Sequence, residues 1–294
     1  VGYGENENPD SETLQLLEEF VIEYIQNLSV LAFRRSRRKN FNEIQLRDLL
    51  YIIKDNNIPN IEDNVSCIGY FDGVHRGHQA LIKVCKDLAK MNNLKSMVIC
   101  FDPDPRDIIS NCKNSHLLSF KDRLDAFREL GVDIVCIIKF DEELMKKEPL
   151  KFIEDILLKL NIKTLVCGFD FSFGYKGKGN TKLLSKYLNT VVIDEIKLYS
   201  KKISSTRIKE AINKGNFKLS NKLLGYNYSL MLKVVNSARK GKKWLIECKL
   251  KDNSLVIPTK LNNKCLCVKN NHLILETSSE LLVGDEILLV FENE

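Results

Sequence analysis

The middle of the chain alternates short apolar segments with longer stretches in which apolar residues recur every three or four positions. The apolar segments predict β-strands at 65–71, 96–101, 133–140, 163–169 and 190–196. The stretches between them predict helices near 78–91, 121–130, 150–160 and 180–188. Strands that alternate with helices are typical of a parallel sheet covered on both faces. The pattern therefore predicts an α/β fold, a Rossmann-like sandwich with right-handed connections.

The chain begins with a different, purely helical pattern. Between Ser11 and about Asn56, apolar side chains recur at helical spacing, at Leu14, Leu17, Val21, Ile25 and Leu28. A basic run at 34–39 interrupts the pattern, and a second helix is predicted from about 42 to 54. The turn residues around Pro59 then predict a boundary. We expect residues 1–56 to form a separate helical segment.

The end of the chain changes pattern again. Two short helices are predicted at 204–213 and 217–224, and the chain beyond Tyr226 becomes strand-like. Its apolar segments predict a small β-barrel or sheet. We therefore divide the chain into a helical segment at 1–56, an α/β domain at 57–225 and a small β module at 226–294.

The composition fits this organisation. A chain of 294 residues has the length of about two domains, and 44% hydrophobic with 29% charged residues is ordinary for a globular protein. The formal net charge of +6 suits a polyphosphate ligand, but it is too small to indicate a nucleic-acid partner. No apolar run approaches the roughly 20 residues of a membrane span, and the N-terminus lacks a signal-peptide pattern. We expect a cytoplasmic protein without a membrane partner.

The nine cysteines are an odd number, which fits a reducing compartment. Cys265 and Cys267 offer only two ligands, so no structural zinc and no other protein-bound metal is predicted. A free thiol within an apolar segment behaves as a small buried hydrophobe. This applies to Cys67, Cys100, Cys136 and Cys167.

The clearest candidate site is the segment from Gly69 to His78, which joins the first predicted strand of the α/β pattern to its first helix. Ligands of open α/β sheets bind at the carboxyl ends of strands, where a helix N-terminus presents free N–H groups to phosphate. Gly73 and Gly77 allow the backbone to approach a ligand closely. His75 and His78 can point the same way and donate to phosphate oxygens. The alternative is an ordinary strand-to-helix turn with two solvated imidazoles.

This segment resembles the signature of the bacterial FAD synthetase domain of bifunctional riboflavin kinase/FAD synthetases, and its HxGH core is that of the nucleotidylyltransferase superfamily. Three further segments resemble the family's motifs in the right order: FDPDP at 101–105, GFDFSFGYKGKGN at 168–180 and KISSTRIKEAI at 202–212. The resemblance covers residues from about 58 to 228. It implies an FMN adenylyltransferase, which transfers the AMP of ATP to FMN to give FAD, with Mg²⁺ accompanying ATP.

The resemblance also implies roles for individual residues. The residues implied to be catalytic, through contacts with the ATP phosphates, are His75, His78, Ser205, Thr206 and Lys209. Those implied to bind the nucleotide or the flavin are Gly69, Phe71, Asp72, Gly73, Gly77, Asp104, Asp170, Phe171, Phe173, Gly174, Ser204 and Arg207. Two alternatives stay open: the 204–206 hydroxyls form only a helix cap, or the 170–173 segment is a strand-end turn with core phenylalanines.

Two positions depart from the family pattern. Asp104 stands where the family usually has histidine, and Lys209 where it usually has arginine. Lysine keeps the charge but loses the bidentate geometry of arginine, which weakens phosphate binding. A carboxylate beside triphosphate repels it unless Mg²⁺ lies between them. We expect activity, and a reduced level is compatible with both changes.

The C-terminal module resembles only part of a known domain. Residues 223–244 resemble the start of the riboflavin kinase barrel of the bifunctional family, but its G-x-P-T-A-N motif does not follow. A partial match at 257–260 lacks the preceding glycine and the following Ala-Asn. We expect a degenerate, non-catalytic module that covers and stabilises the transferase. The competing interpretation is a bifunctional riboflavin kinase/FAD synthetase.

Residues 2–56 resemble part of the histone fold of subunit 13 of the general transcription factor TFIID, without the first helix of that fold. Histone folds form stable cores only as interlocked pairs, so the resemblance implies a histone-fold partner chain. It supports an alternative function as an interaction protein, and a nuclear location if the segment is functional. A gene fusion or an artefact of gene assignment would also explain the combination.

Overall fold

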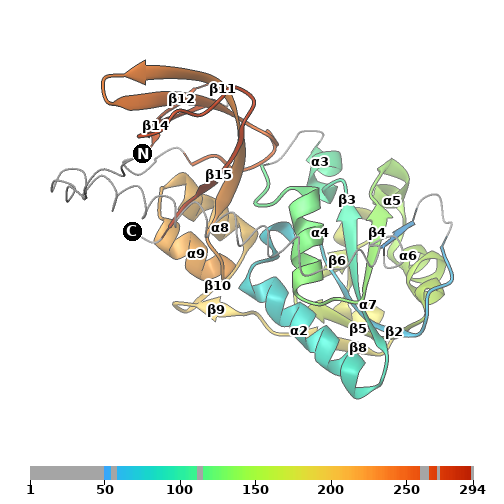
Figure 1. Ribbon diagram of the computed structural model, residues 1–294. Coiled ribbons are helices and arrows are strands. Elements are labelled where there is room, and N and C mark those ends of the chain that lie inside the picture. The colour runs from blue at the N-terminus through green and yellow to red at the C-terminus, as the bar shows by residue number, and fades with distance from the viewer. Residues whose placement is uncertain (1–49, 54–57, 111–114, 259–264, 270–271, 293–294) are drawn as a thin grey trace, which may run out of the picture. The chain divides into compact units, whose positions relative to one another are not determined.

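The structure of the protein is a computed structural model that describes residues 50–53, 58–110, 115–258, 265–269 and 272–292 (Figure 1). The chain divides between Leu46 and Arg47 into two units, and every described residue belongs to the second. The predicted first helix and the basic run at 34–39 lie outside the described residues.

A six-stranded sheet forms the α/β part of the protein, with strand order β1-β4-β3-β2-β5-β8. All five neighbouring pairs are parallel. The strands are β1 (Leu50–Ile53), β2 (Asn64–Ile68), β3 (Lys95–Asp102), β4 (Ile134–Lys139), β5 (Ile162–Gly168) and β8 (Thr190–Ile193). The predicted α/β fold class is confirmed, and the five predicted strands correspond to β2, β3, β4, β5 and β8.

The helix predicted over about 42–54 is wrong at its C-terminal end. Residues 50–53 form β1, which pairs with β4 from Leu50 opposite Val135 to Ile53 opposite Ile138. Ile53 is buried in the core on one face of the sheet. The partner strand lies more than eighty residues further along the chain, so this strand depends on a long-range pairing that local periodicity does not reveal.

Helices cover the sheet on both faces. They are α2 (Arg76–Met91), α3 (Pro105–Ser110), α4 (Phe120–Glu129), α5 (Glu142–Lys146), α6 (Pro149–Asp155) and α7 (Thr181–Leu184). Short 3-10 turns lie at η2 (Asp72–Val74), η3 (Leu157–Leu160) and η4 (Tyr175–Gly177). The helix predicted near 150–160 is broken at Ile156, where the chain leaves helical geometry before η3. The helix predicted near 180–188 is reduced to α7.

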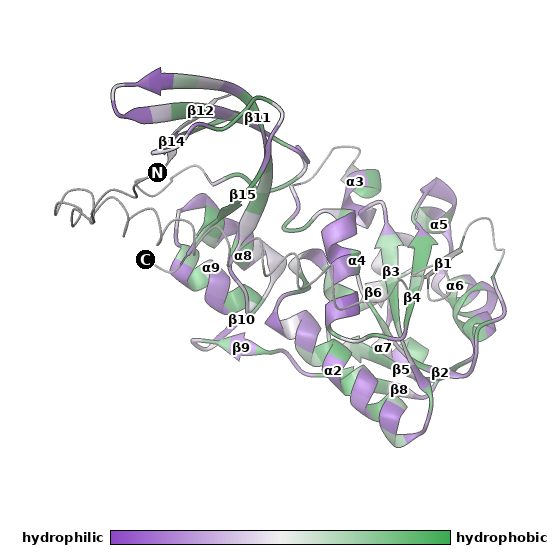
Figure 2. Cartoon of the chain, viewed as in Figure 1, coloured by the Kyte–Doolittle hydropathy of each residue, from purple (hydrophilic) through white to green (hydrophobic). Residues whose placement is uncertain are grey.

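The strands place alternate side chains on opposite faces of the sheet, as the period of two requires. On β3, Met97 and Ile99 join the core that includes residues of α5, α6 and α7, whereas Val98 and Cys100 join the core beneath α2 and α4. Both sets are buried because the sheet is covered on both sides. Figure 2 accordingly shows hydrophobic colouring along β3 and β4 and an alternation of hydrophilic and hydrophobic residues on α2.

A second sheet lies at the C-terminal end of the described chain. It is antiparallel, with order β13-β14-β12-β11-β15. Its strands are β11 (Ser229–Lys240), β12 (Lys243–Leu250), β13 (Cys265–Lys269), β14 (His272–Thr277) and β15 (Glu286–Val290). Its core is continuous with α8 (Ser205–Asn213), α9 (Phe217–Leu224) and Leu117. The division of the chain at 225 and 226 remains a prediction.

Short ladders complete the structure. They are the pair β6 (Ser172–Phe173) and β7 (Gly179–Asn180), and the pair β9 (Lys197–Leu198) and β10 (Lys201–Lys202). Within the described parts of the chain, no helix has the length and apolar character to cross a membrane.

The cysteines predicted to be buried thiols are confirmed. All four, at 67, 100, 136 and 167, are free and fully inaccessible to solvent. Burial raises the pKa of Cys100 to about 12 and of Cys167 to about 11, so these thiols are protonated and unreactive at neutral pH.

Candidate functional site

The loop that follows β2 has an unusual backbone. Phe71, Gly73 and Val74 have positive φ angles of 63°, 78° and 36°. For a β-branched residue such as Val74 this region is sterically unfavourable. A side chain at Gly73 is excluded as well, because a Cβ atom there would lie 2.7 Å from the Leu117 side chain. The loop at 71–74, which we call the phosphate loop after the role that the sequence predicts for it, is thus held in a strained conformation at the carboxyl end of a central strand.

Two histidines mark the start of α2, directly after this loop. His75 is the N-cap residue, and its Nδ1 accepts a hydrogen bond of 3.3 Å from the backbone N–H of His78. The two imidazoles stack with ring centroids 3.6 Å apart and an interplanar angle of 15°. Phe71 packs edge-on against His78 at 5.2 Å. His75 is only 5% exposed, so it is not a solvated imidazole.

Both imidazoles are neutral at physiological pH in this arrangement. Burial is the main cause that lowers the pKa of His75 to about 4, although Asp72 partly opposes it. Burial also lowers the pKa of His78, and the neighbouring His75, Arg123 and Lys202 lower it further. The Nδ1 of His78 is shielded from solvent and has no hydrogen-bond partner among the residues that the structure describes. A neutral imidazole donates through one nitrogen only, and His75 already uses Nδ1 as an acceptor, which leaves its Nε2 as the donor.

The start of α8 lies against the phosphate loop. Ser204 caps the helix by accepting a hydrogen bond of 3.3 Å from the N–H of Arg207, as the simple-cap interpretation requires. Ser205 Oγ donates to the carbonyl oxygen of Asp72 at 3.0 Å. Thr206 is exposed. The guanidinium of Arg207 is directed elsewhere, because it donates to three carbonyl oxygens of the β9–β10 hairpin.

Lys209 is drawn into the loop rather than left in solvent. Its Nζ lies 2.6 Å from Asp72 Oδ2 and donates to the carbonyl oxygen of Ser115 at 2.5 Å. The other oxygen of Asp72 accepts a hydrogen bond of 2.8 Å from the N–H of Leu117. Asp72 is 3% exposed, and it is therefore a buried anchor that connects the phosphate loop to α8 and to the segment before α4.

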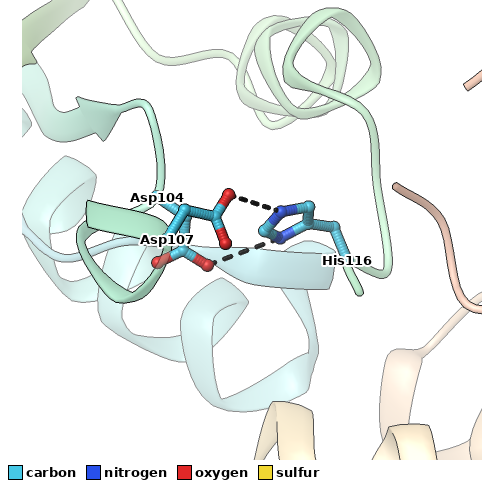
Figure 3. Close-up of side chains that lie close together, drawn as sticks. All are labelled: Asp104, Asp107 and His116. Atoms are coloured by element: carbon cyan, nitrogen blue, oxygen red, sulfur yellow. Dashed lines mark hydrogen bonds and ion pairs between the residues drawn. The ribbon is translucent and has the colours of Figure 1, made fainter. Parts of the chain in front are cut away.

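Asp104, the departure from the family pattern, lies buried in a network of charges (Figure 3). Arg106 approaches it most closely, with 2.6 Å between Nη2 and Oδ2, and also reaches Asp72 at 3.4 Å. His116 Nδ1 is 3.4 Å from Asp104, and His116 Nε2 is 3.3 Å from Asp107. The carboxylate of Asp104 is thus paired with cationic and polar groups of this chain.

The group formed by Asp104, Asp107 and His116 offers three possible metal ligands within 4.8 Å of one another. Its geometry fits an ion-paired cluster better than a resident metal site. The two ring nitrogens of His116 face different carboxylates, and Arg106 already neutralises Asp104. Mg²⁺ prefers oxygen ligands and retains several waters. We therefore assign no metal to this group.

The segment after β5 contains the predicted flavin and adenine contacts. Asp170 forms an ion pair with Lys202 of β10. Phe171 and Phe173 stack with centroids 5.7 Å apart, and Phe173 is buried in the core of the sheet. Gly174 packs tightly on α6, since a Cβ atom there would lie 2.7 Å from Pro149. Phe173 and Gly174 thus pack against the core and α6, whereas Asp170 and Phe171 lie nearer the surface.

The remaining motif glycines permit close packing around the loop. A Cβ atom on Gly69 would lie 3.3 Å from the ring of Phe71, and one on Gly77 would lie 3.2 Å from the ring of His75. The structure therefore brings Gly69, Gly77, the two histidines, Asp72 and Lys209 together with Ser205. It does not direct Arg207 to the same place.

Sequence reasoning missed Arg106 and His116. Arg106 directly follows the FDPDP segment, so its position beside an unusual Asp104 was a usable signal. His116 lies twelve residues beyond Asp104 in an irregular segment, and no periodicity links it to the site. Arg123 was also missed; it donates to the carbonyl oxygens of Tyr70 and Phe101 and so fixes the ends of β2 and β3.

A parallel sheet that carries this loop and helix N-terminus at the carboxyl end of a central strand defines an α/β protein with the general arrangement in which open sheets bind their ligands. The family model described as FAD synthetase matches residues 57–207, which include the phosphate loop and the start of α8. The chain belongs to the FAD synthetase family. A second model, described as transcription initiation factor IID, 18kD subunit, matches residues 1–60, almost all of which lie outside the described residues.

Curated relatives are similar over the same region. The bifunctional riboflavin kinase/FMN adenylyltransferase of Listeria monocytogenes is 36% identical over 186 residues, which cover 61% of this chain and 59% of that protein. The protein of the same name from Buchnera aphidicola of Schizaphis graminum is 36% identical over 197 residues, covering 64% of this chain and 63% of that protein. The match thus spans about three fifths of the length of these relatives.

A solved structure shows the same fold. The crystal structure titled macrolide-efflux protein from Streptococcus pneumoniae aligns with a TM-score of 0.70 and 24% identity, covering 83% of this chain and 89% of that one. An alignment over 83% of the chain must include residues outside 57–207. The similarity concerns the fold alone.

Proposed function

We propose that this protein is an FMN adenylyltransferase, which transfers the AMP of ATP to FMN and releases pyrophosphate. The observation that carries the proposal is the stacked pair His75 and His78 at the N-terminus of α2, within the region matched by the FAD synthetase family. This pair sits beside a strained glycine loop at the carboxyl end of β2. Such a place presents free N–H groups and positive helix potential to phosphate.

The reaction needs alignment and charge neutralisation more than proton transfer. An oxygen of the FMN phosphate attacks the α-phosphorus of ATP and forms a new P–O bond. The bond between the α-phosphorus and the oxygen that bridges it to the β-phosphorus breaks, and its electron pair leaves with pyrophosphate. The attacking phosphate is already an anion, so no general base is required. The protein therefore has to hold two anions in line and stabilise the charge that develops on pyrophosphate.

The imidazoles are suited to stabilising the charge that develops on pyrophosphate. In the neutral form each imidazole donates one N–H to a phosphate oxygen. Arrival of a polyanion favours their protonated forms, since an opposite charge raises the pKa of a histidine. Lys202, which lies close enough to lower the pKa of both histidines, adds positive potential on the same side. Mg²⁺ would enter with ATP as its counterion.

The two departures from the family pattern are compatible with this function. Asp104 does not present a bare carboxylate to triphosphate, because Arg106 and His116 pair with it. Lys209 forms an ion pair with Asp72, with 2.6 Å between Nζ and Oδ2. This contact needs only one nitrogen, so it does not require the bidentate geometry of arginine. We therefore expect neither substitution to abolish catalysis.

One assay tests the proposal. The full chain is incubated with Mg-ATP and either FMN or riboflavin, and the flavin products are separated by chromatography. We expect FAD and pyrophosphate from FMN, and no FMN from riboflavin above a reaction without protein. Absence of FAD would contradict the proposed function. Formation of FMN from riboflavin would show that the C-terminal module is a working kinase and that its sequence was misread.

A further inference from the structure

Three consecutive carbonyl oxygens of the phosphate loop are each held by a side chain from a different part of the chain. The carbonyl of Asp72 accepts from Ser205 Oγ at 3.0 Å, that of Gly73 from the Tyr226 hydroxyl at 2.6 Å, and that of Val74 from Gln79 Nε2 at 2.8 Å. Ser205 begins α8, Gln79 belongs to α2, and Tyr226 follows α9. The loop is thereby fixed from three directions.

The backbone explains why such restraint is needed. Positive φ angles at Phe71, Gly73 and Val74 make the loop conformation unfavourable by itself. Strained residues persist only where the surroundings hold them, and such strain is characteristic of functional loops. A hydrogen bond to each peptide carbonyl restrains the orientation of that peptide group. It also restrains the N–H of the following residue, because the peptide unit is planar.

Tyr226 is attached to the loop together with the end of α9. Gln79 Nε2 also donates to the carbonyl oxygen of Leu224 at 2.9 Å. Gly225, which ends α9 with a φ of 87°, packs on Gln79 so closely that a Cβ atom there would lie 3.2 Å from Gln79 Oε1. The segment 224–226 therefore contacts the loop directly through Tyr226 and indirectly through Gln79, which also donates to the Val74 carbonyl.

We propose that Tyr226 is a positioning residue for nucleotide binding, whose hydroxyl holds the Gly73 peptide of the phosphate loop in the conformation that receives the phosphates of ATP. This inference rests on the proposed function and names a residue outside every motif of the site. It also assigns a role to the start of the C-terminal module: the residue that holds the loop lies shortly before β11.

The test compares two tyrosine variants that lose the same atom. Tyr226→Phe removes the hydrogen bond to the Gly73 carbonyl. Tyr228→Phe, the matched control, removes a buried hydroxyl whose hydrogen-bond acceptor, the Val256 carbonyl at 2.7 Å, is not part of the phosphate loop. We expect Tyr226→Phe to raise KM for Mg-ATP and the Kd for Mg-ATP without FMN by about threefold to tenfold, the range for one lost hydrogen bond. The KM for FMN should change less than twofold.

The control distinguishes positioning from stability. Tyr228→Phe should lower the thermal midpoint at least as much as Tyr226→Phe but leave KM for Mg-ATP unchanged. Gln79→Met, which removes the donor to the Val74 and Leu224 carbonyls, should reproduce the Tyr226→Phe effect on Mg-ATP. Equal Mg-ATP affinity in the wild type, Tyr226→Phe and Gln79→Met would overturn the inference while leaving FAD formation intact. A wild type that forms no FAD would instead contradict the proposed function itself.

Discussion

His78 is the side chain on which the proposed chemistry depends most directly. We expect His78→Ala to lower kcat for FAD formation by about a hundredfold to a thousandfold, a loss of a few kcal/mol of transition-state stabilisation. Folding should be unaffected, because the His78 Nδ1 makes no hydrogen bond and the backbone N–H that contacts His75 remains. Initial rates of FAD formation, with circular dichroism as a check on folding, provide the measurement.

A matched control for this variant lies in the C-terminal sheet. His272 of β14 pairs with Glu247 at 2.7 Å and is remote in sequence from every site motif. His272→Ala should change kcat less than twofold. If His78→Ala also kept the wild-type rate, the assignment of the imidazole pair to phosphate would be wrong.

Asp104 shows what residue-level reasoning could and could not provide. The sequence identified it as a carboxylate that would repel triphosphate unless Mg²⁺ lay between them. The structure surrounds it with Arg106 and His116, which sequence reasoning did not connect to it. That the motif residues around the loop lie together could be predicted from the family resemblance, and their individual roles remain predictions. Their charge partners come from a segment without periodicity and are found only once the chain is folded.

At the scale of elements, the N-cap of α2 connects stability to pH. The pKa of His75 falls from 6.5 to about 4 on folding. The unfolded state therefore binds more protons between these values, so the contribution of His75 is complete above about pH 6.5 and is lost as the pH falls towards 4. His75→Asn keeps a capping acceptor and removes the titrating group.

Between pH 7 and pH 4.5, the free energy of unfolding should fall further in the wild type than in His75→Asn. We expect this difference to be at most about 2–3 kcal/mol, given about 1.4 kcal/mol per pKa unit. Urea unfolding at a series of pH values measures the difference. Parallel pH dependences for the two proteins would show that the His75 imidazole is not kept neutral by burial.

Most elements were predictable, and the failures have physical causes. Strands β2, β3, β4, β5 and β8 were predictable from their apolar segments. Helices α2, α4, α8 and α9 were predictable because their apolar periodicity is strong and their ends carry caps such as Ser119 and Ser204. Residues 50–53 were assigned to a helix because they continue a helical pattern. Their strand depends on pairing with β4, and local sequence contains no record of that partner.

At the scale of the whole molecule, two cores meet at the phosphate loop. Leu117 belongs to the core shared by α8, α9 and the C-terminal sheet, yet its N–H binds Asp72 and its side chain packs on Gly73. The backbone of the neighbouring His116 also pairs with the C-terminal module, since its N–H donates to the Ser254 carbonyl at 2.6 Å. The module is thus connected to the site through both Tyr226 and the 116–117 segment.

The last prediction concerns how much of the N-terminal region the enzyme needs. Two deletions differ in residues 47–56, which include β1: removal of residues 1–46 keeps this strand, and removal of residues 1–56 takes away its pairing with β4 and the buried Ile53. Loss of a buried isoleucine and its strand costs about 2–5 kcal/mol, so we expect the longer deletion to lower the thermal midpoint by roughly 5–15 °C relative to the shorter one. Both should form FAD at low temperature, because every site motif lies beyond Pro59. Equal midpoints would favour the boundary near Pro59 that the sequence predicts. Loss of activity in the shorter deletion would mean that the first 46 residues are integral to the enzyme.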